Sequence, residues 1–260
     1  MYWSDYAETA ILNAFRGQTV TAPTTLYAGA FLSNPTDTGT GTEVAYPGYI
    51  RQPITFSAPT DGSAGTSIVN NADVNFPTSN VAVGNVTYFG FFDSITGGNL
   101  WCYMKVEGDT LTVDAGVAPL IKAGKLQFES RGNFTKVMKA RALNLLRGVN
   151  LTGFRSYIAL FDGNPENGGF ELSGGNYARF PVDFSAPAPQ SAGQMAIGNS
   201  GPVSSNEADT NWGTWSYTVI MDASSGGTPV AFTVKDPVQV MGETRCVTLK
   251  AAGKYKIMMA

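Results

Sequence analysis

An internal repeat is the feature of this sequence that most limits how the chain can fold. The segment Tyr49-Ile-Arg-Gln-Pro-Ile-Thr-Phe-Ser-Ala-Pro59 returns as Tyr177-Ala-Arg-Phe-Pro-Val-Asp-Phe-Ser-Ala-Pro187, with seven of the eleven positions identical. Two unrelated strands of similar composition would not share so many positions. Because a duplication of this kind sets the architecture of the whole chain, its extent has to be established before any element is assigned.

Further landmarks of the first half return 128 to 131 residues later. The segment Leu12-Asn-Ala-Phe-Arg-Gly17 matches Leu143-Asn-Leu-Leu-Arg-Gly148, and the closing segment Ala123-Gly-Lys-Leu-Gln-Phe128 matches Ala252-Gly-Lys-Tyr-Lys-Ile257. The boundary therefore falls near residues 129–132. We predict a first β-sandwich repeat over residues 1–130 and a second, diverged repeat over residues 131–260.

Each repeat is predicted to begin with a helix and to continue with about seven or eight short strands. Residues 4–16 combine Ser4 as a cap, apolar side chains on one face and Gly17 as a stop, and residues 133–147 repeat this pattern before Gly148. Charged residues make up only 14% of the chain, which favours strands and turns over helix bundles. The sequence therefore predicts a mainly β chain of two tandem jelly-roll-like β-sandwich domains, each with a short N-terminal α-helix.

Matched turns are expected at the same places in the two repeats. Each repeat has an Asn-Pro pair after its first long strand, and an Asp followed four and five residues later by two glycines. Asp accepts hydrogen bonds from turn backbone, and Gly supplies the positive φ that tight turns require. The residues assigned to structural turns are Asn34, Pro35, Asp93, Gly97, Gly98, Asn164, Pro165, Asp222, Gly226 and Gly227.

The repeated Tyr-x-Arg-x-Pro segment is predicted to lie at a sheet edge or a bulge. Proline lacks the N–H that a strand donates to its neighbour, so it is confined to such positions. The arginine is almost the only charge in its strand, which indicates a contact between the two copies or with a neighbouring subunit. The residues assigned to assembly or edge contacts are Tyr49, Arg51, Pro53, Tyr177, Arg179 and Pro181.

No catalytic, cofactor-binding or metal-binding residue is assigned, and no cofactor is expected. The chain has no histidine, which removes the Ser-His-Asp and Cys-His constellations and the commonest metal ligand. Asp93 and Asp222 are the one well-matched pair of acids, and a turn role is favoured for them over glycosidase-like catalysis. The loop acids whose spacing does not match a dedicated calcium loop, and which are interpreted as solvated, are Asp37, Asp162, Glu207 and Asp209.

Several aromatic residues are candidates for a sugar-binding platform, although burial in the core or at an interface is favoured because packed sheets bury large rings. These residues are Tyr46, Tyr49, Trp101, Tyr177, Trp212 and Trp215. The net charge of −3 gives no electrostatic reason to expect nucleic acid as a partner. The two cysteines, Cys102 and Cys246, fall at non-equivalent places in the repeats and are predicted to be free.

The first repeat resembles a known family. It combines Ser-Asp-Tyr-Ala-Glu-x-Ala-Ile-Leu-Asn, Ala-Pro-Thr-Thr-Leu-Tyr-Ala-Gly-Ala-Phe, Asn-Pro-Thr-Asp, Gly-Thr-Glu-Val, Gly-Tyr-Ile-Arg-Gln-Pro-Ile-Thr-Phe and Phe-Gly-Phe-Phe-Asp-Ser-Ile-Thr-Gly-Gly-Asn-Leu. This combination resembles small bacteriophage virion proteins that are usually labelled tail fibre proteins and typically hold one such unit. The likeness covers nearly all of residues 1–128, and the second repeat departs from it at Asn164-Pro-Glu-Asn167 and over residues 212–222.

The resemblance implies a non-catalytic structural protein of the phage particle, attached to its surface as head decoration or cement, or associated with the tail. The alternative is a tail-fibre receptor-recognition module that binds host surface glycan, and a polysaccharide depolymerase is the least favoured. Expected partners are other virion proteins of the shell or tail, further copies of this chain and host glycan, without nucleic acid or membrane insertion.

The expected location is the virion, after synthesis in the host cytoplasm without a signal peptide. The start Met1-Tyr-Trp-Ser-Asp-Tyr-Ala-Glu8 has no basic region followed by an apolar core. No apolar run approaches the length that spans a membrane.

Overall fold

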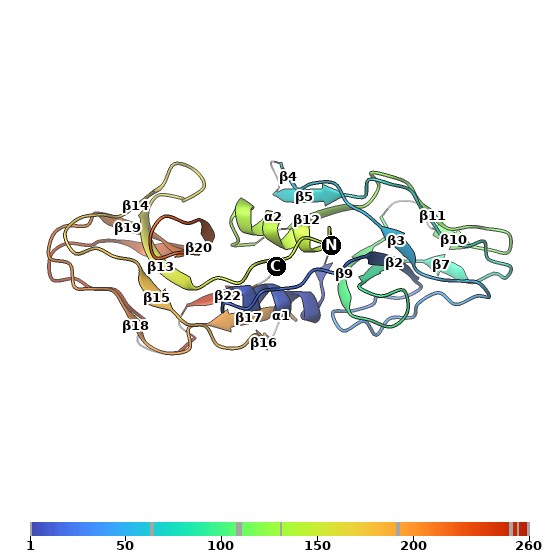
Figure 1. The fold of residues 1–260 in the computed structure, drawn as a ribbon, viewed down its shortest axis with the longest axis horizontal. Coiled ribbons are helices and arrows are strands. Elements are labelled where there is room, and N and C mark those ends of the chain that lie inside the picture. Colours follow the sequence, from blue (N-terminus) through green and yellow to red (C-terminus); the bar gives the residue numbers. More distant parts are fainter. Residues whose placement is uncertain are drawn as a thin grey trace.

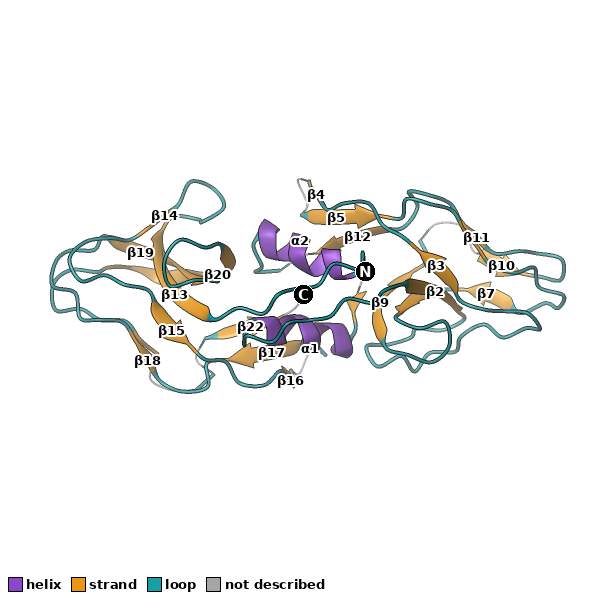
Figure 2. Cartoon of the chain, in the orientation of Figure 1, coloured by secondary structure: helices purple, strands orange, loops and turns teal. Residues whose placement is uncertain are grey.

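A computed structural model describes residues 2–62, 65–107, 111–130, 132–190, 193–249, 252–253 and 255–258. Within this part of the chain the structure is mainly β, with strands that pair antiparallel and one α-helix in each repeat. The mainly β prediction is therefore confirmed. Figure 1 shows an elongated molecule with a β-rich lobe at each end and both helices near the middle, and Figure 2 separates helices from strands by colour.

The first repeat holds helix α1 and twelve of the strands in the described part of the chain. The strands are β1 (Tyr2–Trp3), β2 (Leu26–Phe31), β3 (Gln52–Ile54), β4 (Thr60–Asp61), β5 (Thr66–Val69), β6 (Val74–Asn75), β7 (Gly84–Val86), β8 (Tyr88–Phe92), β9 (Leu100–Lys105), β10 (Leu111–Val113), β11 (Leu120–Ile121) and β12 (Gln127–Ser130), and α1 spans Asp5–Ala14.

The second repeat holds helix α2 and the remaining described strands. These are β13 (Ser156–Asp162), β14 (Phe170–Glu171), β15 (Phe180–Val182), β16 (Ala188–Pro189), β17 (Met195–Gly198), β18 (Val203–Ser204), β19 (Thr214–Met221), β20 (Pro229–Val240), β21 (Thr248–Leu249) and β22 (Lys256–Met258), and α2 spans Lys136–Leu145.

The strand order is the same in outline in both repeats. The largest sheet of the first repeat has the order β1-β9-β8-β2-β3, and its counterpart has the order β14-β13-β19-β20 with β15 paired to β13. A three-stranded sheet follows in each, β12-β5-β4 in the first repeat and β16-β17-β22 in the second. The described strands form small separate antiparallel sheets, and the predicted jelly-roll arrangement is not confirmed. The division into two independent domains remains a prediction.

Each helix begins at a side-chain cap and ends before a glycine with positive φ. The Ser4 hydroxyl accepts a hydrogen bond from the N–H of Ala7, and Gly17 at φ +82° follows the end of α1. The cap of α2 is Thr135, so this helix begins two residues later than the position of Asn133 suggested. Gly148 at φ +79° follows its end.

Each helix packs against strands of both repeats, so the repeats exchange helix contacts. Helix α1 packs against β9 of its own repeat and also against β17 of the second repeat, while α2 packs against β20 of its own repeat and against β5 of the first. Figure 1 shows both arrangements, with α2 beside β5 and β12 and with α1 beside β17 and β22. Each helix therefore buries part of its surface on the three-stranded sheet of the other repeat.

The segments that follow the two helices also pair across the repeats. Val20 and Leu151, which lie 131 residues apart, form an antiparallel bridge with N–H···O distances of 2.8 and 3.0 Å. Arg16 donates from Nε to the carbonyl of Phe184, and its counterpart Arg147 donates to the carbonyl of Phe56. The contact that the first repeat makes with the second is thus matched by an equivalent contact from the second repeat to the first. The repeats are therefore related by an approximate twofold axis that passes near Val20 and Leu151.

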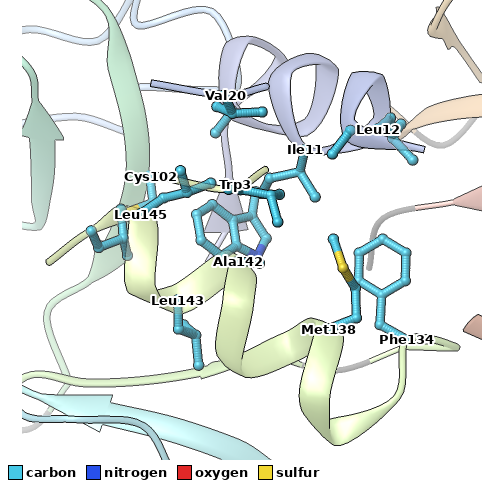
Figure 3. Packing of buried hydrophobic residues seen from close by; sticks show 14 of the residues in the cluster. Trp3, Ile11, Leu12, Val20, Cys102, Phe134, Met138, Ala142, Leu143 and Leu145 are labelled. Atoms are coloured by element: carbon cyan, nitrogen blue, oxygen red, sulfur yellow. The ribbon is translucent and has the colours of Figure 1, made fainter. Parts of the chain in front are cut away.

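One hydrophobic cluster contains buried side chains from both repeats. Leu12 on α1 and Leu143 on α2 occupy equivalent positions and are both fully buried. Figure 3 shows Ile11, Leu12 and Trp3 of the first repeat directed toward the helix that carries Met138 and Leu143. The core between the helices is therefore built by the two repeats together.

Candidate functional site

Arg51 ties three separate segments of the first repeat together. Its Nε and Nη2 donate to the two carboxylate oxygens of Glu43 at 2.9 and 2.7 Å, and its Nη1 donates to the carbonyls of Ser94 and Gly97 at 3.2 and 2.6 Å. The guanidinium carbon also lies 3.4 Å from the centre of the Phe92 ring. A two-point arginine–carboxylate pair fixes orientation as well as distance, so Arg51 holds the loop before β3 against the turn after β8.

Tyr49 completes this network. Its hydroxyl donates to Oε1 of Glu43 at 3.0 Å and accepts a hydrogen bond from the N–H of Ala30 on β2 at 2.8 Å. Burial, with a smaller contribution from the Glu43 carboxylate, raises the pKa of Tyr49 far above its ordinary value. The hydroxyl therefore stays protonated and keeps its role as a donor at any ordinary pH.

The second repeat builds the same network from equivalent residues. Arg179 donates from Nε and Nη2 to Glu171 at 2.8 and 2.7 Å, and from Nη1 to the carbonyls of Ala223 and Gly226. Tyr177 donates to Glu171 at 3.0 Å, and burial raises the pKa of Tyr177 as it does in the first repeat. The repeated Tyr-x-Arg motif is thus explained by a structural requirement of each repeat.

The six residues predicted to make assembly contacts divide into two groups. Tyr49, Arg51, Tyr177 and Arg179 make the hydrogen bonds just described, whereas Pro53 and Pro181 are exposed on the edge strands β3 and β15. The structure therefore brings the tyrosines and arginines into internal networks and turns the prolines toward solvent. An assembly role for these residues remains a prediction.

Sequence reasoning did not single out the carboxylate partner of either arginine. Glu43 and Glu171 each lie six residues before the tyrosine and eight residues before the arginine of their network. This identical spacing in both repeats was the available signal. A lone acid at a constant distance from a repeated arginine indicates an ion pair inside the repeat.

The turns predicted from Asn-Pro and Asp-Gly-Gly patterns are stabilised by their own side chains. Asn34 and Asn164 each accept a hydrogen bond from the N–H two residues later, at 2.9 and 2.8 Å, immediately beside Pro35 and Pro165. The paired glycines all have positive φ, at Gly97, Gly98, Gly226 and Gly227. These residues therefore close the turns through local hydrogen bonds and backbone freedom.

Asp93 and Asp222 are engaged in these turns. Asp93 accepts from the N–H of Asn99 at 2.7 Å, and Asp222 accepts from the N–H of Thr228 at 2.6 Å. Asp222 also forms an ion pair of 2.9 Å with Arg141 of α2. The two carboxylates lie in the turns of separate sheets, where their geometry supports the turn role that the sequence favoured.

Both repeats match one known protein family. The family model described as Podophage GP4 fiber I protein gp80 matches residues 2–129 and matches again over residues 133–241. The chain belongs to this podophage fiber I family. Its two matched segments confirm both the resemblance to a phage tail-fibre-like family and the tandem duplication. No curated protein matches the chain.

Membership in the podophage fiber I family places the chain among virion structural proteins, and the virion is its location. The family is described as one of podophage fibre proteins. The match covers both Tyr-Arg-Glu networks, so each matched unit of this fiber I chain contains a complete one. Its first segment ends and its second begins within four residues of the predicted boundary.

The aromatic residues considered for a sugar platform lie inside this fiber I chain. Trp101, Trp212 and Trp215 are buried, as is Tyr46, and Tyr49 and Tyr177 pack against the same core. The three tryptophan rings and the Tyr46 ring are therefore not presented to a sugar on the surface, and Tyr49 and Tyr177 are partly buried.

Cys102 and Cys246 are both free, as predicted, but only Cys102 is buried.

Three of the four acids weighed as calcium ligands have protein partners for their carboxylates. Asp37 accepts from the hydroxyl of Tyr103 at 2.8 Å, Asp209 accepts from the N–H of Asn176 at 3.0 Å, and Asp162 meets the Ser216 hydroxyl. Within the described residues no group of three or more His, Cys, Asp or Glu side chains could hold a metal ion. Among the same residues no helix has the length and apolar character needed to cross a membrane.

Proposed function

We propose that the chain is a non-catalytic structural subunit on the tail side of the phage particle. The observation that carries this proposal is membership of both repeats in a podophage fiber family. The exchanged helices support it, because they make one rigid unit that displays two similar surfaces to neighbouring subunits. Attachment to the head as a decoration or cement protein is the competing placement.

The proposed contacts to neighbours are the sheet edges formed by β3 and β15. Each is the outer strand of the largest sheet in its repeat, and an unpaired strand edge is a template for pairing with another chain. Pro53 and Pro181 restrict which of the edge groups can pair, because proline has no N–H to donate. In this proposal the internal hydrogen bonds of Arg51 and Arg179 fix the positions of the edge strands. The neighbouring virion subunit or a further copy of the chain contacts the exposed side of each edge.

Electron microscopy of purified particles labelled with antibody fragments against the chain tests this placement. Label confined to the tail supports the proposal, and label distributed over the shell would replace it with head decoration. Antibody fragments absorbed beforehand with an excess of the free chain provide the control. Absence of specific label together with absence of the chain from the particle proteins would overturn the virion role.

A further inference from the structure

A cavity of about 370 Å³ lies at the surface where the end of α1 meets the second repeat. Its lining includes Phe15 and Arg16 from the first repeat together with Arg155, Ser156, Asp183 and Phe184 from the second. A volume of this size is within the range of small-molecule sites. The cavity exists because the repeats pack on each other, and neither repeat could form it alone.

Arg16 is held in place at one side of this cavity. Its Nη1 donates to Oδ1 of Asn13 at 2.6 Å and its Nε donates to the carbonyl of Phe184 at 3.2 Å. These two bonds use only part of the five N–H donors of a guanidinium group. Arg16 is therefore oriented in advance, with donor capacity left for a ligand.

Arg155 lies opposite Arg16. The two residues are partners in an antiparallel bridge, so their backbones are adjacent although they belong to different repeats. The Arg155 side chain is exposed, and its guanidinium lies 6.0 Å from the centre of the Tyr157 ring. Among the described residues neither arginine has an acidic side chain within ion-pair distance. Asp183 is the one acid in the described lining, so one positive charge remains uncompensated there.

The corresponding place on the other side of the twofold axis lacks this charge arrangement. Arg147 is fixed in the same way as Arg16, by Oδ1 of Asn144 and the carbonyl of Phe56. However, the positions equivalent to Arg155 and Asp183 are occupied by Thr25 and Thr55. Arg16 and Arg147 therefore each donate a hydrogen bond to the other repeat. Arg155 adds a second positive charge on one side of the axis only.

We propose that this cavity binds the carboxylate or phosphate group of a small acidic ligand, of the size of a uronic acid or a phosphorylated sugar. Guanidinium groups match the planar geometry of carboxylates and the oxygens of phosphates. Two arginines that line one partly enclosed space attract an oxyanion more strongly than either does on the open surface, because less solvent screens the charges. Binding at this cavity does not depend on where the chain sits in the particle.

Titration of the full chain with inorganic phosphate, glucuronate and glucose, followed by calorimetry or amide chemical shifts, tests this proposal. We expect saturable binding of at least one of the two anions, weakened by added salt, and no binding of glucose. Binding of phosphate alone would assign the phosphate class, and binding of glucuronate alone would assign the carboxylate class. Absence of binding for both anions, or equal binding of glucose, would overturn the proposal.

Variants identify the site. Arg155→Gln should weaken anion binding at least tenfold with an unchanged unfolding curve, because this side chain is exposed and lies outside the core. Lys125→Gln is the control, since it removes one positive charge from an exposed side chain outside this cavity and should leave binding unchanged. Equal loss in the two variants would show a general charge effect and overturn the assignment to this cavity.

Discussion

The carboxylate of Glu8 on α1 accepts a hydrogen bond of 2.6 Å from the backbone N–H of Met195 on β17, so a buried acid of the first repeat is bonded to the second. Burial raises the pKa of Glu8 from an ordinary 4.5 to about 7; the Met195 N–H opposes this shift, and Asp37 and Asp5 add to it. Between these values the native state binds more protons than the unfolded state. The free energy of unfolding should therefore fall as the pH rises through this range.

Glu8→Gln should abolish this part of the pH dependence, because the amide oxygen can still accept from Met195 and carries no charge. We expect the variant to be more stable than the wild type at pH 8 and to lose that advantage at pH 4.5, as measured by thermal unfolding midpoints. Glu166→Gln neutralises a partly exposed acid that accepts from the N–H of Lys136 at the start of α2, and it serves as the control. A difference between Glu8→Gln and wild type that does not change with pH would contradict the account.

Arg51→Ala should destabilise the fold strongly. The substitution removes four hydrogen bonds and leaves the partly buried Glu43 without its cation, which costs about 3 kcal/mol for pairs of this kind. Arg179→Ala should cost a similar amount, because its network is equivalent. Denaturant unfolding measures both, with Arg155→Ala on the surface as a control that changes stability by less than about 0.5 kcal/mol. Arginine variants with wild-type stability and impaired particle incorporation would instead favour a direct assembly contact.

The paired glycines of the hairpin turns should respond unequally to substitution. Gly97 has φ +59° and open space where a Cβ would lie, so Gly97→Ala should cost only the left-handed backbone penalty of about 1–2 kcal/mol. A Cβ on Gly98 would come within 2.5 Å of Oδ1 of Asp93. Gly98→Ala should therefore cost at least about 1 kcal/mol more, because it also disturbs the Asp93–Asn99 hydrogen bond.

Gly226→Ala and Gly227→Ala provide an internal replicate of this comparison, since Gly227 stands in the same relation to Asp222. Chemical denaturation of the four variants measures the free energy of unfolding that each substitution loses, and so ranks the two positions of each turn. Equal losses at the two positions of either turn would show that the aspartate contact does not restrict the second glycine.

Leu12→Ala and Leu143→Ala test the shared core. Both side chains are fully buried at equivalent positions of the exchanged helices, and truncation of such a leucine costs about 2–5 kcal/mol. Because each helix packs on a sheet of the other repeat, we expect either variant to lower the stability of the whole chain in a single transition. Circular dichroism and tryptophan fluorescence should then report the same midpoint. Two separate transitions, with only one displaced by each variant, would support two independent domains.

The parts of the fold that depend on local chemistry could be predicted from the sequence. Ser4 and Gly17 mark the limits of the first helix, and the Asp93 turn follows from the residues that form it. Because the second repeat has matching residues, the same predictions could be made for it. Local capping and turn preferences act over a few residues, so they do not depend on contacts with distant parts of the chain.

The exchange of helices could not be predicted in this way. The apolar pattern around Leu12 shows that the helix buries one face, but it does not show which sheet covers that face. Each repeat carries an equivalent three-stranded sheet, so both choices bury similar surface. Long-range contacts such as Glu8 with Met195 decide between them, and they leave no periodic signal in the sequence.

The internal network of Arg51 could not be predicted for a related reason. Arg51 stood out because its strand has little other charge, and an isolated charge was interpreted as a contact with a neighbour. The structure provides a partner within the repeat, Glu43, that comes from a loop and not from the strand. The edge position of Pro53 was predictable because it follows from the missing N–H of proline alone.

Quantitative mass spectrometry of purified phage particles is the most direct test of the central claim that this chain is a structural subunit of the tail. We expect the chain to be present in every preparation at a copy number comparable with the tail proteins and far below that of the shell protein. A copy number equal to the shell protein would contradict the tail placement, and particles that lack the chain would contradict the structural role itself.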